Sequence, residues 1–233
     1  MTSERLDSDR IERSSGGLSL TPIEGVEIAV GREAVWLFSA WPLRVLASSV
    51  VGGDLDVTHH IVNMHVHRGY HSPDPGADLR AFAGRLGIVE PFVGLLTAAW
   101  TEEARSAWEE ADGIRVGAVV TVGLGVTEAA GLSPPAVCQP STINVLAVLD
   151  ATLERAAAVN GVITATEAKV GALVEAGVRT TEGDPATGTV TDAVVLAWTG
   201  RGPRVPYLGP ATVAGWCLAR AVRQAVREGL LRR

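Results

Sequence analysis

A short, largely apolar run at residues 143–149 constrains the fold most strongly. Its sequence, Ile-Asn-Val-Leu-Ala-Val-Leu, has the length and the branched side chains of a buried strand. A helical pattern follows at once, with Asp150 and Thr152 as candidate N-caps. This helix should continue to about Ala176, where Gly177 stops it. A buried strand that leads directly into a long helix predicts α/β structure for the second half of the chain.

The first third of the chain reads as β-structure. Apolar and polar residues alternate on either side of Gly31-Arg32, which predicts a hairpin of strands at 26–30 and 33–39. Two further strands are expected at 43–49 and 58–67.

The middle of the chain mixes both patterns. Helical spacing at 77–86 ends at Gly87, a candidate C-cap. Strands are expected at 92–98 and 114–122, with an acidic, solvated helix at 102–112 between them.

A strand at 189–198 and a long amphipathic helix at 212–231 complete the predicted fold. The fold class is therefore mixed α/β (α+β), with a β-rich N-terminal third and a mixed sheet packed by helices, two of them long and in the C-terminal half. With 47% hydrophobic residues in 233, the chain has ample material for one core, so a single domain is expected at 18–233. The polar residues 1–17 are expected to form a disordered tail.

Charge and composition exclude several partners. A net charge of −6 gives no basic surface for nucleic acid or for an anionic membrane. No apolar run reaches the ~20 residues that span a bilayer, and the N-terminus does not resemble a signal peptide. Cys138 and Cys217 lie far apart without a CxxC motif, so a reduced, cytoplasmic protein is expected.

Two segments concentrate polar groups in an otherwise apolar half of the chain: Thr-Ala-Thr-Glu-Ala-Lys at 164–169 and Thr-Gly-Thr-Val-Thr-Asp at 187–192. Polar groups inside a protein must be hydrogen-bonded or paired. A ligand site is one explanation for this concentration, and a satisfied structural network is the other.

On the helix, Glu167 and Lys169 point in different directions because residues two apart do not share a face. If the helix lies against the sheet, Lys169 becomes partly desolvated and usable as a base or an electrostatic stabiliser. The alternative is an amphipathic helix that carries two surface charges.

In the second segment, a strand would present Thr187, Thr189 and Thr191 on one face and Asp192 on the other. Gly188 would permit a sharp entry into the strand or a close backbone approach. Asp192 follows a loop and stands near a strand start, where it could act as a general base or a ligand anchor. The alternative is ordinary β-branched strand material.

All five histidines fall between His59 and His71, and strand alternation places His59, Asn63, His65 and His67 on one side. A zinc site needs three converging ligands, whereas same-face strand positions lie about 6–7 Å apart. Without an HExxH motif, a structural or substrate-contacting role is favoured over metal binding.

Two further features have plainer explanations. The glycine-rich residues 122–126 lack a phosphate-binding ending and predict a turn. The six tryptophans could face a large flat ligand, although core packing explains most of them equally well.

Four motifs together carry a family resemblance: residues 141–144 (Ser-Thr-Ile-Asn), 164–169, 187–192 and 207–209 (Tyr-Leu-Gly). Their order resembles the adenosylcobinamide amidohydrolase family, over approximately residues 43–231. The resemblance implies hydrolysis of the amide that joins the aminopropanol side chain to the corrin ring of adenosylcobinamide. The product would be adenosylcobyric acid, used in cobamide salvage.

Amide hydrolysis requires a base, oxyanion stabilisation and an acid for the departing amine. On the resemblance, the hypothesis takes Glu167 as general base, Lys169 as oxyanion stabiliser or proton donor, and Asp192 as a second carboxylate that orients water or substrate. A serine or threonine nucleophile activated by Lys169 is the mechanistic alternative. The expected substrate-binding residues are Ser48, His59, Asn63, Thr142, Asn144, Thr166, Thr187, Thr189 and Thr191.

The resemblance also implies a corrinoid as the small-molecule partner and no resident metal or other cofactor, because cobalt would arrive inside the substrate. Homo-oligomerisation is compatible with the sequence. Two other classes stay open: a corrinoid-binding module without catalysis, and a metal-dependent hydrolase of another small amide.

Overall fold

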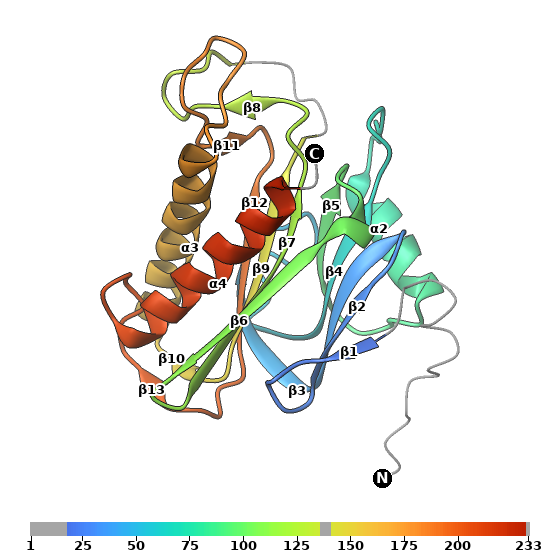
Figure 1. Cartoon of the computed structure of the whole chain (residues 1–233). Helices are drawn as coiled ribbons and strands as arrows, with labels where there is room; N and C mark the ends of the chain where they lie inside the picture. Colours follow the sequence, from blue (N-terminus) through green and yellow to red (C-terminus); the bar gives the residue numbers. More distant parts are fainter. Residues whose placement is uncertain (1–17, 136–140, 232–233) are drawn as a thin grey trace.

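The computed structural model describes residues 18–135 and 141–231 and has four layers (Figure 1). Helices α3 (Arg155–Glu175) and α4 (Val213–Leu230) cover one half of a large mixed sheet. The other half of the sheet packs against the first, and α2 (Pro75–Arg85) covers its outer face. The expected mixed α/β fold, with two long helices in the C-terminal half, is confirmed.

The sheet contains nine strands. The half under α3 and α4 consists of β6 (Arg105–Ala111), β7 (Ile114–Val122), β9 (Ile143–Leu149), β12 (Ala193–Trp198) and the end of β3 (Ala34–Ala47). The other half consists of β1 (Leu18–Leu20), β2 (Val26–Val30), the start of β3, β4 (Val57–His65) and β5 (Val93–Thr97). The shorter elements are η1 (Thr101–Glu103), β8 (Thr127–Glu128), β10 (Thr152–Leu153), β11 (Gly188–Thr189) and β13 (Arg204–Val205).

Strand β3 joins the two halves of the sheet. Its first part pairs with β2 and β4, and its last part pairs with β12. The register shifts between Phe38 and Leu43, around Pro42, which has no N–H to donate to a ladder. The prediction of a separate strand at 43–49 was therefore wrong, because these residues continue β3 beyond a bend.

Three apolar clusters hold the layers together. One lies between the sheet and α3 and α4, the second between the two halves of the sheet, and the third beneath α2. Strand β9 is buried along its whole length because both of its faces are covered, as the apolar run predicted.

The acidic helix expected at 102–112 is not formed. Residues 101–103 make a 3₁₀ turn, and β6 then pairs antiparallel with β7. Trp108 lies opposite Gly117, where an added Cβ would come within 2.2 Å of the indole ring. Glu109 accepts a hydrogen bond from Arg220 Nε of α4 (3.0 Å). Pairing and packing between distant segments therefore override the helix-like charge pattern.

Two predicted boundaries also change. Helix α3 begins after Glu154, and neither Asp150 nor Thr152 caps it, because Thr152 belongs to β10 and Asp150 accepts from Thr199. Its end at Ala176, followed by Gly177 with a φ of 68°, is as predicted. The expected strand at 189–198 is interrupted at 190–192, which separates β11 from β12.

Some expectations concern residues outside the described ranges, namely the tail 1–17 and Cys138. Cys217 is buried on α4, and burial raises the pKa of its thiol. Among the described helices, none is both long and apolar enough to cross a membrane.

Candidate active site

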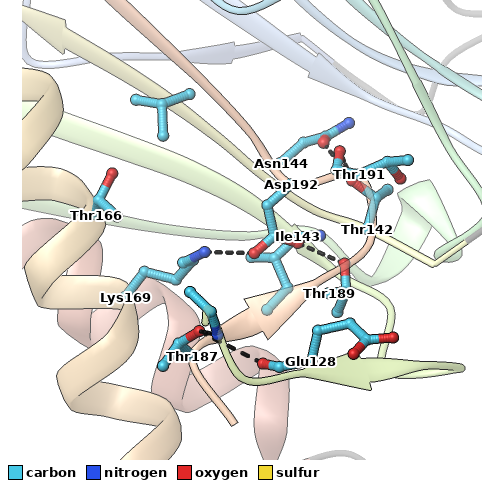
Figure 2. A network of polar contacts seen from close by, with 12 residues as sticks. Glu128, Thr142, Ile143, Asn144, Thr166, Lys169, Thr187, Thr189, Thr191 and Asp192 are labelled. Atoms are coloured by element: carbon cyan, nitrogen blue, oxygen red, sulfur yellow. Dashed lines mark hydrogen bonds and ion pairs between the residues drawn. The ribbon is translucent and has the colours of Figure 1, made fainter. Parts of the chain in front are cut away.

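A buried ion pair joins the two polar segments (Figure 2). Lys169 projects from α3, and its Nζ donates to Oδ2 of Asp192, which immediately precedes β12. The two side chains are only 8% and 14% exposed. Because a buried charge is costly unless paired, each of these groups requires the other. The two segments therefore meet, twenty-three residues apart in sequence.

The carboxylate of Asp192 is fixed by donors on both oxygens. The backbone N–H of Ile143 donates to Oδ1 (2.9 Å), and Thr189 Oγ1 also donates to Oδ1. With Lys169 on Oδ2, three elements, α3, β9 and β11, determine where this carboxylate points. Such multiple support is typical of a preorganised polar site.

Gly188 makes room for the ion pair. A Cβ at this position would lie 2.3 Å from Asp192 Oδ2 and 2.8 Å from Lys169 Nζ. The backbone approaches so closely because β11 pairs with β8, with Gly188 opposite Glu128. The close backbone approach expected at Gly188 is confirmed.

The three threonines do not line one face of a strand as expected, because the chain turns at 190–192. Thr187 Oγ1 accepts from the Ala130 N–H (2.9 Å) and so ties β11 to the segment after β8. Thr191 Oγ1 donates to the carbonyl of Ser141 (3.0 Å), and Thr189 Oγ1, which donates to Asp192, lies 2.7 Å from the same carbonyl. Their hydroxyls therefore secure the turn that positions Asp192.

Buried amides connect this site to the other half of the sheet. Asn144 Nδ2 donates to Asn63 Oδ1 (2.8 Å) and to the Leu96 carbonyl (2.9 Å). Asn63 Nδ2 in turn donates to Thr121 Oγ1 (3.0 Å). The Thr142 hydroxyl lies 2.7 Å from Asn144 Oδ1 and 2.8 Å from the Thr191 carbonyl. Asn63 and Asn144 are thus bonded within the protein, and they position Thr142.

A cavity of about 690 Å³ opens beside the ion pair, and Asp192 lies in its wall. The cavity is bounded by both halves of the sheet and by the loop that precedes α2. Its apolar side chains include Val50, Val66, Leu95 and Leu96. Its hydroxyl groups include Ser48, Thr97, Thr142 and Thr191. An apolar surface with a few placed polar groups is the usual composition of a small-molecule site.

Other predicted site residues lie apart from the cavity. Glu167 is exposed on α3 and does not line this cavity. Thr166 Oγ1 donates to the Val162 carbonyl within its own helix (2.8 Å). His59 Nδ1 contacts the Ser39 carbonyl (2.8 Å), near the start of β4. The structure therefore brings Lys169 and Asp192 together but leaves Glu167, Thr166 and His59 outside.

The loop before α2 supplies cavity residues that the sequence did not single out, including Tyr70, His71 and Ser72. Tyr70 donates to Asp78 Oδ2 (2.7 Å), and burial, reinforced by this bond, raises the pKa of Tyr70. In the sequence, only the clustering of histidine and tyrosine beside a proline-rich loop distinguishes the position of Tyr70.

The histidines have separate surroundings. His60 Nε2 lies 2.8 Å from Glu90, and His65 Nδ1 lies 2.9 Å from the Ala99 carbonyl. The prediction that His67 lies on the same side of one strand as His59 was wrong, because His67 lies beyond the end of β4. Within residues 18–135 and 141–231, no three His, Cys, Asp or Glu side chains are grouped so as to hold a metal ion.

Comparisons with known proteins agree on one family. The model of the adenosylcobinamide amidohydrolase family matches residues 20–233. A protein of Methanosarcina mazei named adenosylcobinamide amidohydrolase is 31% identical over 196 residues, covering 80% of this chain and 90% of its own. A protein of the same name from Halobacterium salinarum is 41% identical over 91 residues, covering 39% of this chain and 36% of its own.

Among solved structures, the PH0078 protein from Pyrococcus horikoshii OT3 is similar in fold. It superposes with a TM-score of 0.50 at 13% identity, covering 94% of this chain and 82% of its own. At this identity the likeness concerns the fold alone.

Proposed function

Because this chain belongs to the adenosylcobinamide amidohydrolase family, and is therefore a hydrolase of an amide bond, we propose that its substrate is adenosylcobinamide. Hydrolysis of the aminopropanol amide would give adenosylcobyric acid, an intermediate that cobamide salvage can use. The observation that carries the proposal is the buried Lys169–Asp192 pair, whose carboxylate lies in the wall of the 690 Å³ cavity.

The cavity suits a corrinoid in its chemistry. A corrin ring has broad apolar faces and a rim of amide side chains. The aliphatic residues of β5 would contact the ring, and the hydroxyls of Ser48, Thr142 and Thr191 would bond rim amides.

Asp192 is the group best placed to act on the scissile amide. In the proposed reaction it takes a proton from water as the water oxygen bonds to the amide carbon. The C–N bond then breaks, and Asp192 passes the proton to the departing amine. Lys169 donates to the carboxylate of Asp192 and keeps it in position, and its positive charge stabilises the oxyanion. The exposed Glu167 takes no part in this scheme, so Asp192 replaces it as the proposed base.

The test is a turnover assay with adenosylcobinamide, in which adenosylcobyric acid is detected by chromatography. Asp192→Asn is expected to lower kcat by at least ~100-fold, because it removes the base. Glu167→Gln is the matched control, another carboxylate-to-amide change, and should retain kcat within about twofold because its side chain faces solvent. A large loss in Glu167→Gln together with normal turnover in Asp192→Asn would reverse the two assignments.

The wild-type protein distinguishes the functional classes. A corrinoid spectrum that shifts without product would indicate a binding module. Neither a shift nor product would indicate another amide substrate. We also propose that turnover survives treatment with a chelator, because Asp192 rather than a metal activates water. Loss of turnover that added zinc restores would contradict this scheme.

A further inference from the structure

We propose that a second cavity, of about 600 Å³, receives the adenosyl group of the corrinoid and so selects the adenosylated substrate. This inference rests on the proposed function, since it concerns another part of the same ligand. The second cavity shares Ala98 and Ser141 with the first. One ligand with a branch can therefore occupy both.

The two cavities differ in chemistry. Aliphatic side chains are prominent in the first, whereas the second is lined by Arg68, Trp100, Glu103 and the glycine-rich residues 122–126. A corrin ring suits the first set. A flat heterocycle carrying a hydroxylated sugar suits the second, because it requires a stacking surface and hydrogen-bond partners.

Trp100 supplies the stacking surface. The ring of His65 stacks behind it, with centroids 4.9 Å apart and an angle of 21° between planes. His65 is itself fixed by its contact with the Ala99 carbonyl (2.9 Å). Trp100 remains 58% exposed and lines the cavity, whereas His65 does not line it. An adenine ring placed there would extend the His65–Trp100 stack.

The glycine-rich loop supplies the edge contacts. Gly123 N–H donates to the Thr142 carbonyl (2.9 Å), and Ser141 Oγ donates to the Gly123 carbonyl (2.9 Å), so the loop is tied to the segment beside Asp192. The N–H groups of Leu124 and Gly125 have no acceptor among the described residues. They can donate to adenine nitrogens, and the Glu103 carboxylate can accept from ribose hydroxyls.

The test measures equilibrium binding of two corrinoids that differ only in the upper ligand, adenosylcobyric acid and cyanocobyric acid, followed by visible absorbance. Both lack the aminopropanol amide, so turnover does not complicate the titration. Trp100→Ala should weaken binding of the adenosyl form about tenfold or more and of the cyano form less than twofold. Trp100→Phe should restore most of the difference.

Trp216→Ala is the matched control, because Trp216 is 47% exposed on α4 and lines neither cavity. Glu103→Gln is a second variant and should also weaken only the adenosyl form. Equal weakening of both corrinoids, or no effect in either variant, would overturn the proposal. A wild-type protein that prefers the adenosyl form but hydrolyses no corrinoid would support this cavity assignment and reject the proposed reaction.

Discussion

Lys169 and Glu167 lie two residues apart in one helix yet have opposite environments, buried and exposed. Helical geometry predicted that they point in different directions, and the structure confirms it. The pairing of Asn144 with Asn63 could not be predicted, because it joins residues 81 positions apart. Local spacing therefore indicates which way a side chain points, whereas its partner depends on the folded sheet.

Gly188→Ala tests how tightly the ion pair is enclosed. The added methyl group would overlap Asp192 and Lys169, so turnover should fall at least tenfold and stability by ~1–3 kcal/mol. Gly84→Ala in α2 is the control, because its added Cβ meets nothing within 4 Å and alanine favours a helix by ~0.5–1 kcal/mol. Assays of turnover and urea unfolding would measure both effects. Unchanged turnover in Gly188→Ala would show that the pair need not keep this geometry.

Among the elements, those with a regular local pattern were predicted best. The hairpin of β2 and β3, the strands β4, β5, β7 and β9 and the helix α4 are confirmed. The prediction of a helix at β6 was wrong because its acidic residues resemble a solvated helical face. The strand forms through pairing with β7 and packing against α4, which the local pattern does not show. The break between β11 and β12 was missed because threonine and valine favour a continuous strand.

Thr212→Ala tests the start of α4. Thr212 Oγ1 accepts from the Gly215 N–H (3.1 Å), so its loss should lower the free energy of unfolding by ~0.5–2 kcal/mol. Thr152→Ala is the control, because Thr152 lies in β10 and does not cap α3. Urea unfolding compares the two variants. A larger loss in Thr152→Ala would contradict the observed caps.

For the whole molecule, the free energy of unfolding at acid pH should depend on His60. This side chain is buried on β4, and its ring packs against the ring of Trp36. Trp36 Nε1, which can only donate, bonds to His60 Nδ1 (3.1 Å), so this nitrogen carries no proton in the folded state. Burial lowers the pKa of His60 below 6.5, although Glu90 opposes the shift. The unfolded chain then binds the proton more readily, so stability is complete above pH 6.5 and is lost as the pH falls through the folded pKa.

Urea unfolding between about pH 7.5 and about pH 5 would measure this dependence, with a slope of at most ~1.4 kcal/mol per pH unit from this group. His60→Gln should show a shallower decline. His67→Gln, at an exposed position, should decline as the wild type does. Equal slopes in the wild type and in His60→Gln would refute the assignment.

The sharing of β3 between both halves of the sheet affects how the chain is made. The ribosome completes residues 44–47 of β3 long before their partner β12, which pairs Val195 with Ala47 and Trp198 with Arg44. During synthesis this end of β3 offers an unpaired edge to other nascent chains. Yield in cells should therefore depend on chaperones that shield the edge until β12 has left the ribosome and paired with β3.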